Sequence, residues 1–124
     1  MFNEIDYGPD ENQPETQVIA RIGAGALKAW EEHAIVPPGW NFKPKEAISH
    51  WQTFAARIIN EFPEKTILVV TSNGIARFSP WLTGDFEAFC NQHKIKISTG
   101  ALCIFEKSPD ESPWRCAAWN IKPD

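Results

Sequence analysis

The stretch TILVVTSNGIARF, residues 66–78, combines residue types that suit an anion site. An apolar-leaning run precedes Thr-Ser-Asn-Gly, and a helical pattern follows directly. In open α/β sheets ligands gather where strands end, and a helix that begins there offers unpaired N–H groups to a phosphate. Gly74, next to Asn73, would let the backbone come close, Ser72 can donate a hydroxyl, and Arg77 would add positive charge. The alternative is that Ser72 only caps the helix and Gly74 only eases packing.

A second group of polar residues lies in FNEIDYG, residues 2–8. Glu4, Asp6 and Tyr7 cluster there beside Gly8. Carboxylates near a loop glycine are usually a solvated face, so the residue types alone assign no chemistry to this segment.

Length and composition limit the class of protein. The 124 residues are long enough for one core, so residues 1–124 are expected to be a single domain or part of one. With 12 basic and 16 acidic residues the net charge is −4, which offers no footprint for nucleic acid. No apolar run is long enough to span a membrane and no signal peptide pattern opens the chain, so we expect no membrane partner and a cytoplasmic location.

Cysteine and histidine spacing does not indicate a metal site, and we expect no cofactor. Three cysteines recur every thirteen residues, unlike a C-x-x-C knuckle or a dense disulfide framework, and they are expected to be reduced: Cys90, Cys103 and Cys116. Cys103 and Cys116 could approach each other if they lie on neighbouring strands. The histidines have no second ligand at metal spacing: His33, His50 and His93.

Apolar periodicity predicts two long helices. Ile19, Ile22, Ala26 and Trp30 recur at helical spacing, so one helix is expected from about Pro14 to His33 despite two glycines. A clearer amphipathic helix is predicted over 46–62, stopped by Pro63. Core packing explains the tryptophans on these apolar faces better than a stacking platform does.

The rest of the chain alternates as in an α/β domain. TILVV is a short, continuous and mostly β-branched run, which predicts a strand buried on both faces of a mostly parallel sheet. Residues 73–80 and 84–93 are expected to be helical. TGALCIFEK and WRCAAWNI predict two closing strands joined by the turn-rich SPDESP.

Together these segments resemble the histidine phosphatase superfamily, the phosphoglycerate mutase-like proteins. FNEIDYG is similar to the family segment L-N-E-x-x-Y-G, which implies Glu4 as proton donor and Tyr7 near the substrate. TILVVTSNGIARF is similar to a family strand ending V-V-T-H-G-G, followed by V-I-R. GALCIFEK and WRCAAWNIKP resemble the closing strands. The resemblance implies a partial phosphoglycerate mutase-like sheet with helices on its faces.

Two departures from the family pattern bear on activity. The family nucleophile is the histidine of an R-H-G motif, and the 124 residues contain no such triplet. The chain therefore resembles the carboxyl-terminal half of a phosphatase, without the amino-terminal strand that carries this motif. Ser72 stands where the family has its second catalytic histidine, and Asn73 replaces the first glycine. Loss of one well-placed donor costs about a hundred- to a thousandfold in rate, whereas loss of the nucleophile abolishes the chemistry.

Two functions follow as hypotheses. The first is phosphomonoester hydrolysis or phosphoryl transfer on a small phosphorylated metabolite, with a nucleophile from outside this chain and the chain alone inactive. The second is a noncatalytic remnant that binds inorganic phosphate, another anion or a partner. Because the 67–71 strand would lack a neighbour, we expect the chain to pair with a second copy or with a separate amino-terminal half.

Overall fold

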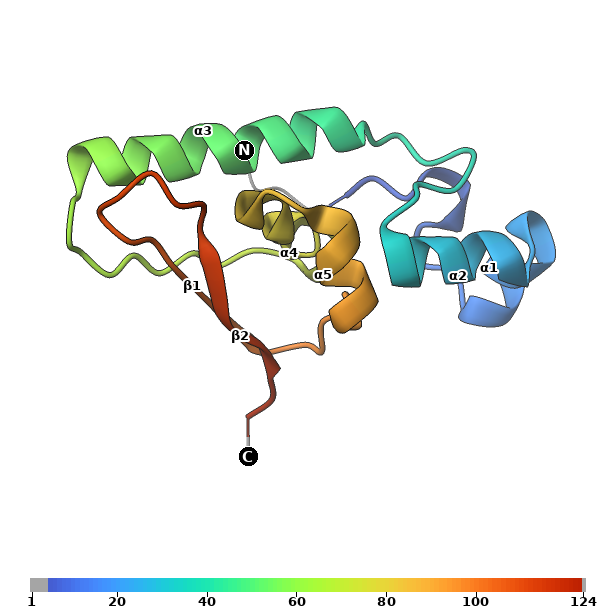
Figure 1. Cartoon of the computed structure of the whole chain (residues 1–124). Coiled ribbons are helices and arrows are strands. Elements are labelled where there is room, and N and C mark those ends of the chain that lie inside the picture. Colours follow the sequence, from blue (N-terminus) through green and yellow to red (C-terminus); the bar gives the residue numbers. More distant parts are fainter. Residues whose placement is uncertain (1–4, 124) are drawn as a thin grey trace.

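The structure, a computed structural model, describes residues 5–123 (Figure 1). The long helix α3 lies along one side of the molecule, with α4 and α5 beneath it, α1 and α2 at one end and the β-hairpin at the other. The elements in chain order are η1 (Gly8–Asp10), α1 (Glu15–Ile22), α2 (Ala24–His33), α3 (Pro44–Glu61), α4 (Asn73–Ala76), η2 (Ser79–Thr83), α5 (Phe86–Gln92), β1 (Leu102–Glu106) and β2 (Arg115–Ile121).

The expected single helix from Pro14 to His33 is wrong, because the chain breaks at Gly23. The φ angle of Gly23 is 89°, in the left-handed region that favours glycine. Its N–H donates to the Ile19 carbonyl at 2.7 Å, which closes α1, and its carbonyl accepts from Leu27 at 3.3 Å as α2 begins. The periodic apolar pattern therefore belongs to two short helices.

The second predicted helix is confirmed as α3. It begins with Pro44 in the first turn, where a missing N–H costs nothing, and it ends one residue before Phe62. Ala47, Trp51 and Ala55 recur every four residues and are buried, so one stripe of the helix faces the core.

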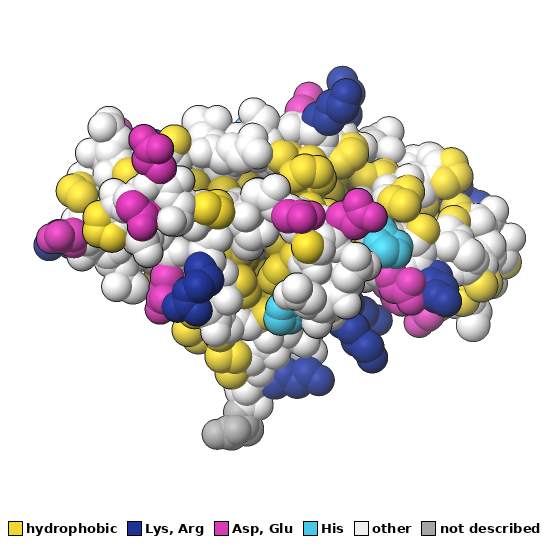
Figure 2. Space-filling view, in the orientation of Figure 1, with side chains coloured by type: hydrophobic (Ala, Val, Ile, Leu, Met, Phe, Trp, Pro, Cys, Tyr) yellow, Lys and Arg dark blue, Asp and Glu magenta, His cyan; other side chains and the backbone are white. Residues whose placement is uncertain are grey.

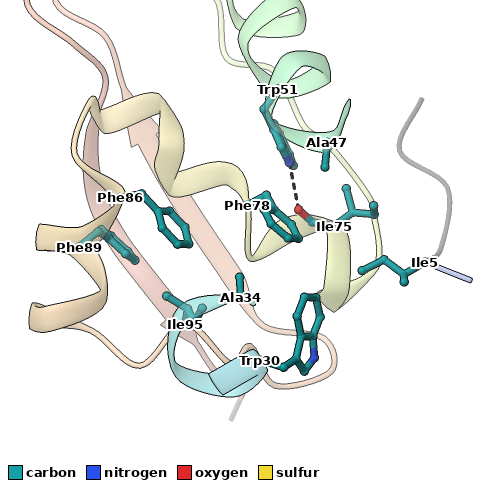
Figure 3. Close-up of a cluster of buried hydrophobic side chains, with 10 residues drawn as sticks. All are labelled: Ile5, Trp30, Ala34, Ala47, Trp51, Ile75, Phe78, Phe86, Phe89 and Ile95. Atoms are coloured by element: carbon teal, nitrogen blue, oxygen red, sulfur yellow. Dashed lines mark hydrogen bonds between the residues drawn. The ribbon is translucent and has the colours of Figure 1, made fainter. Parts of the chain in front are cut away.

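The core lies between α2, α3, α4 and α5 and is rich in aromatic rings (Figure 3). Phe78 is 1% exposed, and its ring centre lies 6.0 Å from that of Trp30. Trp51 reaches across from α3, and its Nε1 donates to the Ile75 carbonyl at 3.0 Å. The core therefore fixes α3 against α4.

The two closing strands are confirmed as an antiparallel hairpin. Phe105 pairs with Cys116 and Glu106 with Arg115, with register shifts nearer the start of β1. Trp119 connects the hairpin to α5, since its ring centre lies 4.9 Å from that of Phe89 and its Nε1 donates to the Lys94 carbonyl at 2.8 Å.

The expected strand over 67–71 is wrong in both its pairing and its burial. Within the part of the chain that the structure describes, the backbone of Ile67–Val70 makes no hydrogen bond. Leu68 is 78% exposed and Val70 is 85% exposed, whereas Val69 packs against the core. The backbone is extended and the side chains alternate, but no neighbouring strand is present to complete a ladder.

The fold class is therefore α/β, with five helices and a two-stranded antiparallel sheet over residues 5–123, and the expected mostly parallel sheet is wrong. Hydrophobic side chains reach the surface near the C-terminal end of the molecule (Figure 2). Leu102 and Ile121, paired at one end of the hairpin, are each 48% exposed. Over the described residues, no helix has both the length and the apolarity that a membrane crossing requires.

Candidate functional site

The site begins at Ser72, which occupies the N-cap position of the short helix α4. Its backbone is extended, with φ −82° and ψ 160°, and its carbonyl accepts from the Ala76 N–H at 2.9 Å. The side chain makes no capping hydrogen bond, and its Oγ is buried without a hydrogen-bond partner among residues 5–123. An orphaned buried hydroxyl costs about 1–3 kcal/mol, so a ligand that bonds to it would recover that free energy. The interpretation of Ser72 as a simple cap is wrong.

Gly74 follows two residues later and has no room for a side chain. A Cβ there would lie 2.5 Å from Ile5 Cδ1 and 3.1 Å from the Tyr7 hydroxyl. Gly74 therefore has a packing role, as one of the two interpretations held. Its small size also lets the N-terminal segment place the Tyr7 hydroxyl against α4.

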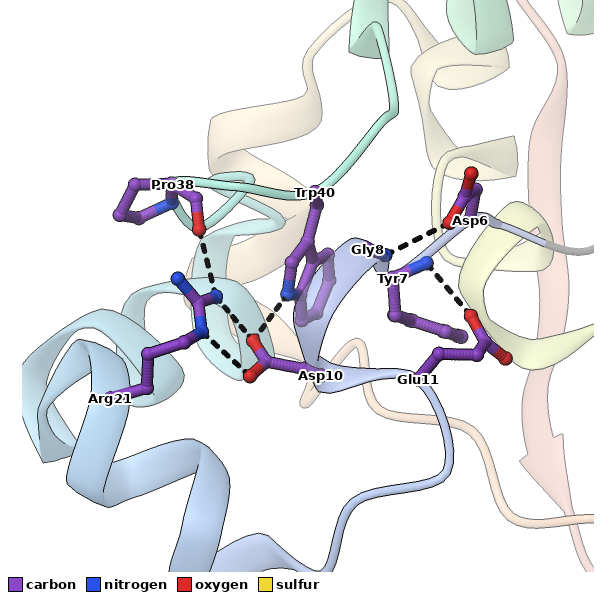
Figure 4. Close-up of polar contacts among 8 residues, drawn as sticks. All are labelled: Asp6, Tyr7, Gly8, Asp10, Glu11, Arg21, Pro38 and Trp40. Atoms are coloured by element: carbon purple, nitrogen blue, oxygen red, sulfur yellow. Dashed lines mark hydrogen bonds and ion pairs between the residues drawn. The ribbon is translucent and has the colours of Figure 1, made fainter.

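The loop around Tyr7 is held by its own polar groups (Figure 4). Asp6 accepts from the Gly8 N–H at 2.9 Å and from Asn41 Nδ2 at 3.2 Å, and these bonds lower the pKa of its carboxyl. The Tyr7 N–H donates to Glu11 at 3.0 Å. Asp6 is thus held as an ionised structural group. Glu4, the expected proton donor, lies outside the described residues.

The sequence did not reveal an ion pair that supports this loop. Asp10 is only 7% exposed, and it accepts from Arg21 Nε at 2.7 Å, from Arg21 Nη2 and from Trp40 Nε1 at 2.8 Å (Figure 4). Arg21 also donates to the Pro38 carbonyl at 2.8 Å. The bond from Arg21, together with that from Trp40, lowers the pKa of Asp10 to about 2. This pair ties η1 to α1 and to the loop before α3.

A pocket of about 510 Å³ lies beside this loop. Tyr7, Trp30, Trp40 and Arg77 contribute to its walls, and Ser72, Asn73 and Gly74 do not. The predicted site residues therefore separate into two places at the two ends of α4: Ser72 at its start, and Arg77 with Tyr7 in the pocket.

Arg77 and the two pocket tryptophans reach this place by long-range packing. Arg77 is 5% exposed, its Cζ lies 4.3 Å from the centre of the Trp30 ring, and its Nη1 donates to the Trp30 carbonyl at 3.3 Å. The Trp40 ring meets Tyr7 edge-on at 4.8 Å and Trp30 at 5.0 Å. Trp30 and Trp40 were not predicted as site residues. The sequence signal for them was weak: Trp40 stands in the proline-rich loop PPGW, shortly after the helical segment that carries Trp30.

The cysteines contribute no reactive group to either place. Cys103 and Cys116 do lie on neighbouring strands, and both are free thiols. Burial raises the pKa of both, so they stay protonated at neutral pH. Over residues 5–123 no three His, Cys, Asp or Glu side chains are arranged to hold a metal ion.

Fold and site thus define an α/β protein in which a four-residue helix carries an orphaned hydroxyl at one end and a buried arginine at the other. A family model describes the same chain: that of the histidine phosphatase superfamily (branch 1) matches residues 1–122. The chain therefore belongs to the histidine phosphatase superfamily, and the resemblance seen in the sequence is confirmed. Neither a search of curated proteins nor a search of solved structures gave a significant match.

Proposed function

We propose that this chain carries the phosphate-binding and proton-donating part of a histidine phosphatase acting on a small phosphorylated metabolite, and that it is inactive alone. The observation that carries the proposal is the buried, unpartnered Oγ of Ser72, at the start of α4, in a chain that matches the superfamily over residues 1–122. A phosphoryl oxygen is an acceptor that this hydroxyl can satisfy.

The proposed phosphate site is formed by the start of α4 and the N-terminal segment packed on it. Ser72 donates its hydroxyl to the phosphoryl group, Asn73 and Gly74 present backbone N–H groups, and the Tyr7 hydroxyl lies beside them, close to Gly74. Glu4, three residues before Tyr7 in the same segment, supplies the proton.

The proposed reaction has two steps. A histidine from outside these 124 residues attacks phosphorus, and the bond from phosphorus to the leaving oxygen breaks as Glu4 protonates that oxygen. Water then attacks the phosphohistidine and releases inorganic phosphate. In the mutase variant, a second hydroxyl compound takes the place of water. Ser72 assists through one hydrogen bond but cannot carry positive charge, which leaves the site weaker than one with histidine there.

The surface that would receive the nucleophile segment is the extended backbone of Ile67–Val70. Four consecutive residues there make no backbone hydrogen bond to the described part of the chain, and Leu68 and Val70 are exposed. A strand added to this edge would satisfy the backbone and cover the apolar side chains. Because the segment runs directly into Ser72, an added strand that ends beside Thr71 would place its own terminal residues near the phosphate site. A second copy of the chain is the other occupant for the same edge.

The test is reconstitution. The full chain is mixed with a segment that carries the R-H-G strand of a superfamily member, and hydrolysis of para-nitrophenyl phosphate is measured. We expect turnover only in the mixture, with loss of about a hundredfold or more in Glu4→Gln and little change in the exposed control Glu111→Gln. Ser72→His should raise the rate of the mixture by about a hundredfold or more. An inert mixture in which the two parts bind each other would contradict the enzymatic proposal.

A second candidate function is favoured by the serine at this position. Ser72 can hold an anion without accelerating its transfer, so a noncatalytic phosphate-binding or partner-binding protein is the alternative. Phosphate binding that Ser72→Ala weakens, in a chain that gives no turnover under any of the reconstitution conditions, would favour it. A longer natural chain with an R-H-G triplet upstream of these residues would favour the enzyme.

A further inference from the structure

The pocket at the other end of α4 holds a buried cation that lacks a counterion. Arg77 is 95% buried, yet within the described structure no carboxylate lies at ion-pair distance from it. Nη1 donates one long hydrogen bond to the Trp30 carbonyl, and Nε is buried without a partner in the described part of the chain. Nη2 donates no hydrogen bond to the residues that the structure describes and is not among the enclosed atoms, and Arg77 is one of the residues that line the pocket.

A charge in this state is costly. Burial lowers the pKa of Arg77, and the nearby Tyr7 and Glu31 oppose that effect only in part. Contact with the Trp30 ring offsets part of the desolvation cost but supplies no acceptor for Nε or Nη2. An anionic group entering the pocket would supply an acceptor for Nη2.

The charges around the pocket limit what that anion can be. Asp10 forms an ion pair with Arg21, and Glu31 forms one with Lys96, whose Nζ lies 3.4 Å from Glu31 Oε1. Among the lining residues that the structure describes, the carboxylates of Glu11 and Glu15 have no ion-pair partner, and Arg77 is the cation without one. A polyanion would be repelled by this rim, whereas a molecule with one negative and one positive group would match it.

The rest of the lining combines apolar side chains with the polar residues Asn12 and Gln13. Val18 and Leu27 face the pocket from α1 and α2, and the Trp40 ring closes it from the loop before α3. A pocket of about 510 Å³ lies within the usual range for small molecules. The ligand therefore needs an apolar body of moderate size between its two charges or beside them.

We propose that this pocket binds a small zwitterion of the amino acid type with an apolar side chain. The carboxylate is held by Arg77 in a charge-assisted hydrogen bond, the ammonium lies toward Glu11 and Glu15, and the side chain packs against Val18, Leu27 and Trp40. This amino acid site is separate from the phosphate site proposed at Ser72, and the proposal does not depend on phosphoryl chemistry.

Calorimetric titration of the full chain tests each charge separately. The probes are L-leucine and L-phenylalanine, L-leucinamide without the carboxylate, 4-methylpentanoate without the ammonium, and inorganic phosphate. We expect saturable binding of at least one amino acid, and about tenfold or greater weakening for both truncated forms of leucine if leucine is the one that binds. The proposal is overturned if neither amino acid binds. It is equally overturned if leucinamide binds as tightly as leucine or if phosphate binds more tightly than either amino acid.

Variants locate the binding. Arg77→Gln should abolish amino acid binding, while Arg57→Gln, at an exposed arginine of α3 paired with Glu61, should leave it unchanged. Because Arg77 is buried and its replacement can unfold the chain, Glu15→Gln at an exposed position gives a second test. This substitution should weaken leucine binding about tenfold and leave the binding of 4-methylpentanoate unaffected. Unchanged leucine affinity in Glu15→Gln, or in a folded Arg77→Gln, overturns the assignment.

Discussion

Phe78 and Leu68 lie ten residues apart in the chain and are 1% and 78% exposed, respectively. Phe78 is surrounded by rings from α2 and from the loop before α3, whereas Leu68 belongs to an extended segment that no strand of residues 5–123 pairs with. Both regions have the apolar composition of a buried element. The difference shows that Phe78 finds its packing partners within the described residues, whereas Leu68 does not.

The comparison also holds for polar groups. Trp51 Nε1 in the core donates to the Ile75 carbonyl, but the backbone of Ile67–Val70 makes no hydrogen bond to any of the described residues. Ser72, directly after that segment, has an orphaned hydroxyl. Unmet hydrogen-bonding capacity is therefore found where the proposed nucleophile segment and phosphate would bind, and again at Arg77 Nε.

The largest expected effect comes from a matched pair of phenylalanine truncations. Phe78→Ala should lower the free energy of unfolding by about 3–5 kcal/mol, because it empties a fully enclosed site. Phe62→Ala, at a residue that is 46% exposed, should cost about 1 kcal/mol or less. Urea denaturation of both variants measures the difference. Equal losses would contradict the assignment of a well-packed core to the Phe78 region.

A smaller effect is expected where only the core hydrogen bond is removed. Trp51→Phe keeps an aromatic ring but removes one of the two donors to the Ile75 carbonyl, which still accepts from the Phe78 N–H at 3.1 Å, so it should cost about 0.5–1.5 kcal/mol in unfolding free energy. The same replacement at Trp81, which is 36% exposed and stacks on Phe86, should cost less. A Trp81→Phe loss that equals the Trp51→Phe loss would show that the bond to Ile75 adds little.

The open edge should affect association and not folding. Leu68→Asp with Val70→Asp should change the unfolding free energy of the chain by about 0.5 kcal/mol or less, since both side chains are already exposed. The same pair should weaken binding of the R-H-G segment, or of a second copy, by about tenfold or more. Sedimentation at micromolar concentration measures this, with Ile59→Asp on the exposed side of α3 as control. A chain that stays monomeric with every partner tried would refute the docking edge.

The smallest effect depends on pH. The pKa of Asp10 falls from 3.8 to about 2 in the folded chain, chiefly through the bond from Arg21. Because the folded pKa is the lower one, the Asp10 contribution to stability is complete above about pH 4 and is lost as the pH falls toward about 2. The stability difference between wild type and Asp10→Asn should therefore shrink across that window in acid denaturation. A difference that stays constant down to pH 2 would contradict the ion pair.

Sequence reasoning succeeded where structure depends on local pattern. The α3 stripe of Ala47, Trp51 and Ala55 repeats within one element, and the hairpin strands are joined by a short turn-rich link. It failed at Gly23, where the apolar period continues across a glycine whose backbone turns out of the helix. It failed at Ile67–Val70 because a strand needs a neighbour, and the residues themselves do not say whether one is present.

The candidate site divides in the same way. Ser72 and Gly74 were found because a strand-like run, small polar residues and a helix follow one another in sequence. The Asp10–Arg21 pair and the pocket formed by Trp30, Trp40 and Arg77 join segments up to 47 residues apart, so their proximity is a property of the packed chain. Family resemblance indicated Tyr7 and Glu4 as site residues, but it could not show that Ser72 Oγ and Arg77 Nε lack partners among the described residues.

The central claim is that this chain holds part of a phosphatase site and lacks its nucleophile, and phosphoenzyme formation tests it most directly. The full chain and the R-H-G segment, separately and mixed, are incubated with a labelled phosphomonoester and assayed for acid-labile phosphohistidine. We expect no label on the chain, alone or mixed, and label on the histidine of the segment only in the mixture. Label on His33, His50 or His93 of the isolated chain, or a bound mixture that is never labelled, would contradict it.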